Sequence, residues 1–262
     1  MKISYLRLVV SLSLPLFVSC GGGGQMGGNG GGISQTPPPV TSFAENWHFA
    51  SALSSSSIEA ALTLSSSSVV GVGHFQSFST SSPCPSFFDS FPLSGTIDGQ
   101  GNVSVKSSSV SGLVLFLTGV LAPDRASVSS GSYHFTGGCA AGETGTLTGV
   151  KVKPLTGLFT GTMQGAGNSV SISTQLTQGP TSGNDGLFPL AGTFTVANMC
   201  DETFTLNGAS VVGDTVHLYS NTGTGLEGLT GVMDSEAQQI ELDDYPFLGD
   251  CIAGAHGIVT RQ

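Results

Sequence analysis

Residues 102–106 read NVSVK, and the same alternation of apolar and polar residues recurs at 149–153 (GVKVK), 169–173 (SVSIS) and 193–196 (TFTV). Successive side chains of a β-strand point to opposite faces of a sheet, so a period of two indicates strands buried on one face. The run at 58–64 also alternates and is short for a helix, so we interpret it as a strand. We therefore expect an all-β protein.

Turn-forming pairs such as Asp98-Gly99 and Gly213-Asp214 recur about every ten residues and divide the chain into short strands. Strands are expected near 46–53, 58–65, 69–78, 91–97, 102–108, 112–121, 131–136 and 144–153, and again near 156–163, 168–177, 188–197, 203–209, 214–219, 226–233, 239–244 and 255–260. Consecutive hairpin-connected strands can close as a barrel or fold as a sandwich. We expect two tandem antiparallel β-meander units that are barrel-like, with a sandwich as the alternative.

An internal repeat supports the two units. Residues 133–145 and 245–257 share the pattern Tyr-x-Phe-x-Gly-x-Cys-x-Ala-Gly-x-x-Gly at an offset of 112, and LTGV occurs at both 117–120 and 229–232. Self-similarity at a fixed offset indicates a tandem duplication. The expected organisation is a signal peptide at 1–19, a flexible tether at 20–42, a first β unit at 43–153 and a second at 154–262.

The cysteines divide into one near the N-terminus and four in the β units, namely Cys84, Cys139, Cys200 and Cys251. Disulfides persist in exported proteins, and four cysteines allow three pairings. Since each repeat holds one early and one late cysteine, the most economical pairing joins Cys84 to Cys139 and Cys200 to Cys251. Each unit is thus expected to contain one disulfide.

The N-terminus has the pattern of an export signal. Lys2 and Arg7 precede an apolar stretch at 8–18, which is too short for a permanent membrane helix. Residues 16–20 (LFVSC) resemble the lipobox of bacterial lipoproteins, and that resemblance implies lipidation of Cys20. Nine glycines among residues 21–32 then form a stretch that cannot bury apolar area and is expected to act as a tether.

Composition excludes some function classes. The chain of 262 residues has a formal charge of −10 and no strongly basic region, so it lacks the electrostatic footprint that nucleic-acid binding requires. It contains no G-x-S-x-G elbow and no H-E-x-x-H pair, and GTGLEG at 223–228 precedes a strand-like run instead of a helix. No catalytic residue and no cofactor are expected.

A few side chains are candidate ligands. Glu241 and Asp243 would share one face of a strand beside Asp244 and are weak candidates for a metal site, although solvated charge at a strand edge is the favoured interpretation. The repeated Tyr133 and Tyr245 could line a ligand cavity, because barrel interiors bind small ligands. His74 and His217 are expected on outward strand faces.

The chain as a whole resembles a family of uncharacterised lipoproteins of Acidobacteria. The lipobox, the glycine tether, NWHF at 46–49, LSGT at 93–96 and the Tyr-x-Phe…Cys…Gly-Thr-Leu-Thr ending carry the resemblance. It implies a lipid anchor in the cell envelope and offers no established activity. Gly21, directly after the candidate lipidated cysteine, is compatible with sorting to the outer membrane, which is the expected location.

The function expected from the sequence is a structural or interaction role in the cell envelope, without catalysis. The expected partners are the membrane, through lipid on Cys20, and an envelope protein or glycan. The alternative is a small-molecule or glycan-binding module, and an extracytoplasmic hydrolase is a weaker hypothesis.

Overall fold

The computed structural model describes residues 44–51, 57–76, 90–138, 140–165, 168–181, 183–198, 201–221, 226–244 and 255–262. Their regular structure is antiparallel β-sheet with one short 3-10 turn, η1 (Gly183–Asp185). The expectation of an all-β protein is therefore confirmed. In the part of the chain that the structure describes, no helix has the length and apolar character that crossing a membrane requires.

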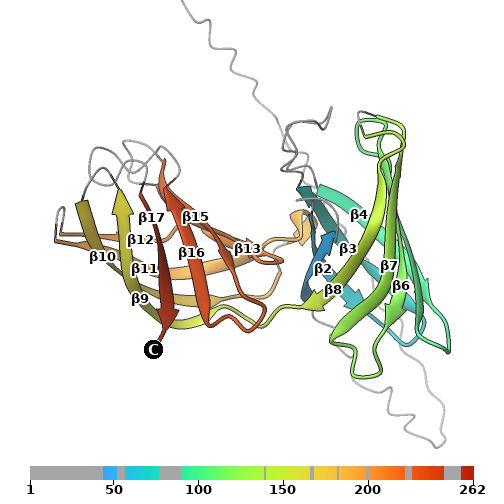
Figure 1. Ribbon diagram of the computed structural model, residues 1–262, viewed down its shortest axis with the longest axis horizontal. Coiled ribbons are helices and arrows are strands. Elements are labelled where there is room, and N and C mark those ends of the chain that lie inside the picture. Colours follow the sequence, from blue (N-terminus) through green and yellow to red (C-terminus); the bar gives the residue numbers. More distant parts are fainter. Residues whose placement is uncertain are drawn as a thin grey trace, which may run out of the picture. The chain divides into compact units, whose positions relative to one another are not determined.

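The first eight strands form a closed barrel in which each strand pairs with its neighbours in sequence and β8 pairs back with β1 (Figure 1). The strands are β1 (Glu45–Ser51), β2 (Ser57–Leu64), β3 (Ser68–Gln76), β4 (Ser90–Ile97), β5 (Asn102–Ser107), β6 (Val114–Leu121), β7 (Ser127–Thr136) and β8 (Thr144–Lys151). The barrel alternative is correct for this unit, and the sandwich alternative is not.

Apolar side chains at alternate strand positions fill the interior of this barrel. In β4 the buried side chains are Phe91, Leu93 and Ile97, and the exposed residues Pro92, Ser94 and Thr96 alternate with them. Trp47 and Phe49 of β1 point inward in the same way, with their rings stacked at a centroid separation of 5.9 Å. These apolar contacts are the main stabilising term, because burial contributes about 1.5–3 kcal/mol for each large apolar side chain.

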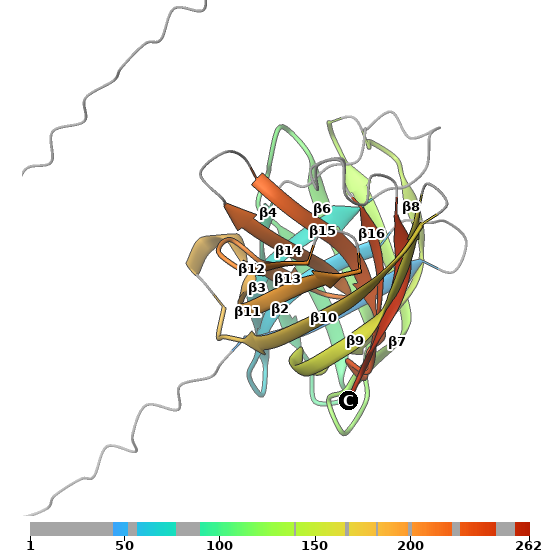
Figure 2. The same cartoon turned by 90° about the vertical axis from the view of Figure 1, so that its left-hand side faces the viewer.

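The remaining strands form a second closed ring, seen from the front in Figure 2. They are β9 (Thr156–Gly165), β10 (Asn168–Gln178), β11 (Phe188–Ala197), β12 (Glu202–Thr205), β13 (Ser210–Val212), β14 (Thr215–Asn221), β15 (Leu226–Met233), β16 (Gln239–Asp244) and β17 (His256–Arg261). The ring runs through β9, β10, β11, β13, β14, β15, β16 and β17, and β17 pairs back with β9. The short strand β12 pairs with the other end of β11.

One expected strand is wrong. A single strand is expected at 203–209, but the chain forms β12 and β13 with a break between them. Gly208 in the break has a φ of +110°, a conformation that residues with a side chain rarely adopt. Both short strands lie along β11, β12 beside Thr193–Val196 and β13 beside Phe188–Pro189. Together they take the position that β4 has in the first barrel.

The second barrel has its own apolar core, which includes Phe159, Met163, Phe194 and Leu218. The segment between β8 and β9 belongs to this core, since its Val152 is buried among these residues. The last three strands of each barrel begin at the repeat offset of 112: β6 and β15, β7 and β16, and β8 and β17.

Candidate functional site

Polar side chains on the outer face of β1 and β2 are buried, which is unusual for the outside of a barrel. Because Trp47 and Phe49 point into the core, Asn46 and His48 point outward, and Glu59 lies directly opposite His48 in the register of β1 with β2. Asn46 is 4% exposed and Glu59 only 1%. A segment from the second barrel covers them.

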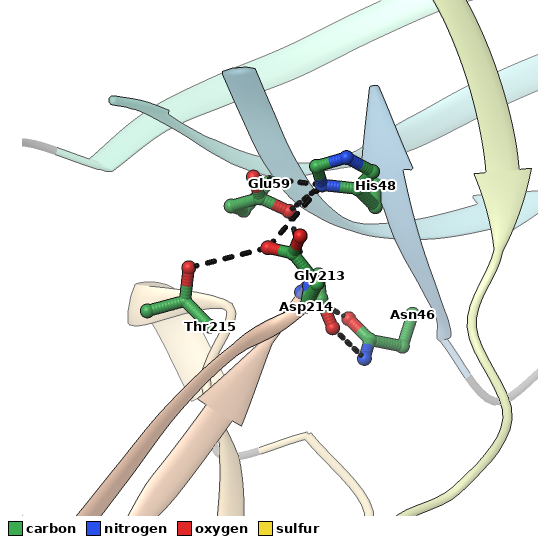
Figure 3. Close-up of polar contacts among 6 residues, drawn as sticks. All are labelled: Asn46, His48, Glu59, Gly213, Asp214 and Thr215. Atoms are coloured by element: carbon green, nitrogen blue, oxygen red, sulfur yellow. Dashed lines mark hydrogen bonds and ion pairs between the residues drawn. The ribbon is translucent and has the colours of Figure 1, made fainter. Parts of the chain in front are cut away.

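That segment is the tight turn between β13 and β14, formed by Gly213 and Asp214 (Figure 3). Asn46 donates from Nδ2 to the Gly213 carbonyl oxygen at 2.8 Å, and its Oδ1 accepts from the Gly213 amide. The Asp214 amide in turn donates to Oε2 of Glu59 at 3.2 Å. Gly213 has a φ of +57°, and a Cβ on it would overlap the Glu59 carboxylate, so only glycine fits here.

Three ionisable groups meet at this turn. Nδ1 of His48 lies 3.0 and 2.9 Å from the two carboxylate oxygens of Glu59 and 3.3 Å from Oδ1 of Asp214. Figure 3 shows this nitrogen facing both carboxylates and the other ring nitrogen pointing away. The side chains of His48 and Asp214 are each 20% exposed, so solvent reaches the cluster from one side. We call these three residues the triad.

The charges of the triad depend on one another. Burial by itself lowers the pKa of His48, but the hydrogen bonds and negative charges of Asp214 and Glu59 outweigh it and raise that pKa from 6.5 to about 10. Burial also raises the pKa of the Glu59 carboxyl; His48 opposes this rise and the charge of Asp214 adds to it. At neutral pH one imidazolium therefore faces two carboxyl groups.

A second contact lies further along the same outer face. His74 of β3, opposite Glu59 in the register of β2 with β3, forms a 2.8 Å hydrogen bond from Nε2 to the carbonyl oxygen of Asp185 in η1. Burial lowers its pKa, although the contact with Asp185 opposes this. The prediction that His74 lies on the outward face of its strand is confirmed. Its side chain is nevertheless buried, because η1 covers it.

His217 also points away from the core of its barrel, between the buried Val216 and Leu218, and its Nδ1 lies 3.2 Å from the hydroxyl of Tyr219. Burial lowers its pKa, and the nearby His74 lowers it further.

The structure does not bring the predicted acidic candidates together as a metal cluster within its described residues. Glu241 and Asp243 are exposed on the outer face of β16, opposite Ile258 and His256 of β17. In the described part of the chain, the side chains that lie close enough together to hold a metal ion are those of the triad. The side chain of Asp244 lies outside the described residues.

Tyr133 is part of the apolar interior of the first barrel. It is 4% exposed, its ring packs edge-on against Phe135, and its hydroxyl donates to Oε1 of Glu143 at 3.3 Å. Tyr133 therefore lines the packed core. Tyr245, the lipidation candidate Cys20 and the cysteines Cys84, Cys139, Cys200 and Cys251 lie outside the described residues, so their predicted roles stay predictions.

Sequence reasoning missed the triad because its members face outward in strands and turns that are far apart along the chain. One signal was present: Glu59 interrupts the apolar run IEAAL at 58–62 in a chain with only 9% charged residues. A charge is costly to bury unless it is paired, so such a residue indicates a partner, but not which one.

Comparison with models of protein families, with curated proteins and with solved structures finds no match to this chain.

Proposed function

We propose that this protein is a lipid-anchored component of the bacterial cell envelope with a structural or interaction role and without catalytic activity. Lipid on Cys20 would hold it to a membrane, with the outer membrane as the proposed location, and the glycine-rich segment would separate the anchor from the two barrels. The export-type N-terminus, the lipobox resemblance and the resemblance to lipoproteins of Acidobacteria support this proposal.

The packing of the first barrel is the observation that carries the interaction role. A cavity of about 30 Å³ in its interior is lined mainly by apolar side chains, among them Trp47, Phe49 and Leu117, and by Thr118. That volume is close to one water molecule, whereas small-molecule sites measure about 300–1,000 Å³. The barrel would therefore bind a partner through the outer faces of its strands and not through its interior.

Apolar side chains are present on those outer faces. Val232 of β15 is 49% exposed and Ile258 of β17 is 46% exposed, and they flank Glu241 in one cross-strand row. A contiguous exposed apolar patch rimmed by polar residues marks a protein interaction site, and these two side chains would form part of such a patch. This row is a candidate contact surface for an envelope protein.

Glycan binding is the second candidate, and one surface favours it. An open groove of about 400 Å³ crosses the outer face of β9, β10 and β11. Of the eight described residues that line it, five carry a hydroxyl, namely Thr160, Thr162, Ser171, Ser173 and Thr195, and none is charged. Hydroxyls both donate and accept hydrogen bonds, so such a surface suits the hydroxyls of a neutral sugar.

Replacement of Cys20 by serine tests the anchor. The wild-type chain should fractionate with membranes and incorporate labelled fatty acid, whereas Cys20→Ser should do neither, because serine offers no thiol for lipidation. Cys84→Ser is the matched control and should stay in the membrane fraction. Equal membrane binding of Cys20→Ser and wild type, without label in either, would refute the lipid anchor.

A glycan-array measurement separates the two roles. If the groove binds sugars, Ser173→Arg should abolish binding to any glycan that the wild type retains, while Val232→Arg should leave it unchanged. Retained binding in Ser173→Arg would exclude the groove as the glycan site. If the wild type binds no glycan, the protein-interaction role is favoured.

A further inference from the structure

We propose that His48, Glu59 and Asp214 form a binding site for a divalent transition-metal ion, with zinc as the best-fitting candidate. The site is independent of the proposed envelope role, since it rests on the contact of β1 and β2 with the turn at Gly213 and Asp214.

The donor atoms already have nearly the spacing that a metal requires. Zinc binds histidine nitrogen and carboxylate oxygen at about 2.0–2.2 Å, and tetrahedral geometry then separates neighbouring donor atoms by about 3.4 Å. Nδ1 of His48 lies 3.3 Å from Oδ1 of Asp214 and 2.9 Å from Oε2 of Glu59. One donor atom from each residue falls within 4.8 Å of the other two. Relative to Nδ1 of His48, each carboxylate oxygen would therefore have to move by only a few tenths of an ångström to reach tetrahedral spacing.

The charge balance of the triad also favours a cation. Two carboxylates share a single imidazole, and Glu59 is 1% exposed, where an uncompensated charge is costly. With both carboxylates ionised, an imidazolium leaves one negative charge in excess. A divalent ion with neutral imidazole and the same two carboxylates gives a net charge of zero.

The surroundings hold the donors in place and leave one side open. The two hydrogen bonds of Asn46 fix Gly213, and the Asp214 amide donates to Glu59, so the turn that carries Asp214 is held by partners in the first barrel. His48 and Asp214 are partly exposed, which gives an ion an entry path and leaves room for a water molecule as fourth ligand. Three protein ligands and one water form a common zinc coordination.

The donor set narrows the choice of ion. Sites built from carboxylate and carbonyl oxygens suit calcium and magnesium, whereas imidazole suits zinc, copper, iron and nickel. A triad with one imidazole nitrogen and two carboxylates therefore favours a transition metal over calcium.

Isothermal titration of the detergent-solubilised full chain with zinc chloride, after treatment with chelator, tests the proposal. We expect one zinc ion per chain for the wild type and for Asp243→Asn, a control that removes an exposed acid of β16. Glu59→Gln and Asp214→Asn should each weaken binding by more than about tenfold, since loss of an outer-shell partner alone costs about 10–100-fold. Calcium chloride in place of zinc should give no comparable binding.

The variants keep all five cysteines, so zinc held by thiolates would bind to wild type and variants alike and would overturn the proposal. Absence of zinc binding to the wild type would overturn it as well. Asp214 is partly exposed and its substitution by asparagine preserves shape, so this variant keeps the test decisive if Glu59→Gln does not fold. X-ray absorption of the zinc-loaded wild type should show only nitrogen and oxygen neighbours, one of them imidazole; sulfur neighbours would contradict the site.

Discussion

Replacing Asn46 with alanine removes both side-chain hydrogen bonds that join β1 to the backbone of Gly213. Gly213 is buried, so its amide and carbonyl groups would lose their partners away from bulk water. A buried polar group without a partner costs about 1–3 kcal/mol, and two such groups give an expected loss of about 2–6 kcal/mol in the free energy of unfolding. The upper part of that range applies only if water cannot enter the space left by the amide.

Urea unfolding monitored by tryptophan fluorescence measures this loss, because Trp47 is the only tryptophan in the chain and lies in the core of the first barrel next to Asn46. Asn102→Ala is the matched control: its side chain bonds to Asp98 in an exposed hairpin turn, and its removal should cost less than about 1 kcal/mol. If Asn46→Ala changes stability no more than Asn102→Ala does, the contact with Gly213 does not stabilise the protein.

Three further outcomes are expected. Burial lowers the pKa of His74 below its ordinary 6.5, so the unfolded chain takes up the proton first and stability should fall as the pH drops below about 6.5; urea midpoints at pH 7.5 and 5.5 should differ less in His74→Gln. Gly213→Ala should lower the thermal midpoint by several degrees, since a Cβ would overlap Glu59 and the backbone there has a positive φ; an unchanged midpoint would refute this packing. Glu236→Gln should change unfolding free energy by less than about 0.5 kcal/mol in urea, because its ion pair with Lys153 is exposed, and a larger loss would show that this pair matters.

Strand positions were predictable because alternation records which face of each strand is buried. The predicted strands at 188–197, 226–233 and 239–244 coincide with β11, β15 and β16. The error at 203–209 has a physical reason: all three residues of β13 are buried, so this segment has no alternation to mark it as a separate strand. Closure of the first barrel requires β8 to pair with β1. The sequence did not predict this pairing, because no local pattern specifies it.

The triad was not predictable for a different reason. His48 and Glu59 lie on the outer face of their barrel, where the alternation pattern predicts exposure to solvent. Their burial depends on a turn that lies 155 residues after Glu59 in the sequence, and no periodicity connects the two. The tandem repeat did not help, because the residues at the repeat offset from His48 and Glu59 are Thr160 and Ser171, which cannot ionise.

A double-mutant cycle between His48 and Asp214 tests most directly that the triad forms across the two barrels. Unfolding free energies of the wild type, His48→Gln, Asp214→Asn and the double variant would be measured in urea with chelator present, so that no metal contributes. The contact at 3.3 Å predicts a coupling energy of about 0.5–3 kcal/mol at pH 7. A coupling energy indistinguishable from zero would contradict the account, because the two side chains would then not be in contact.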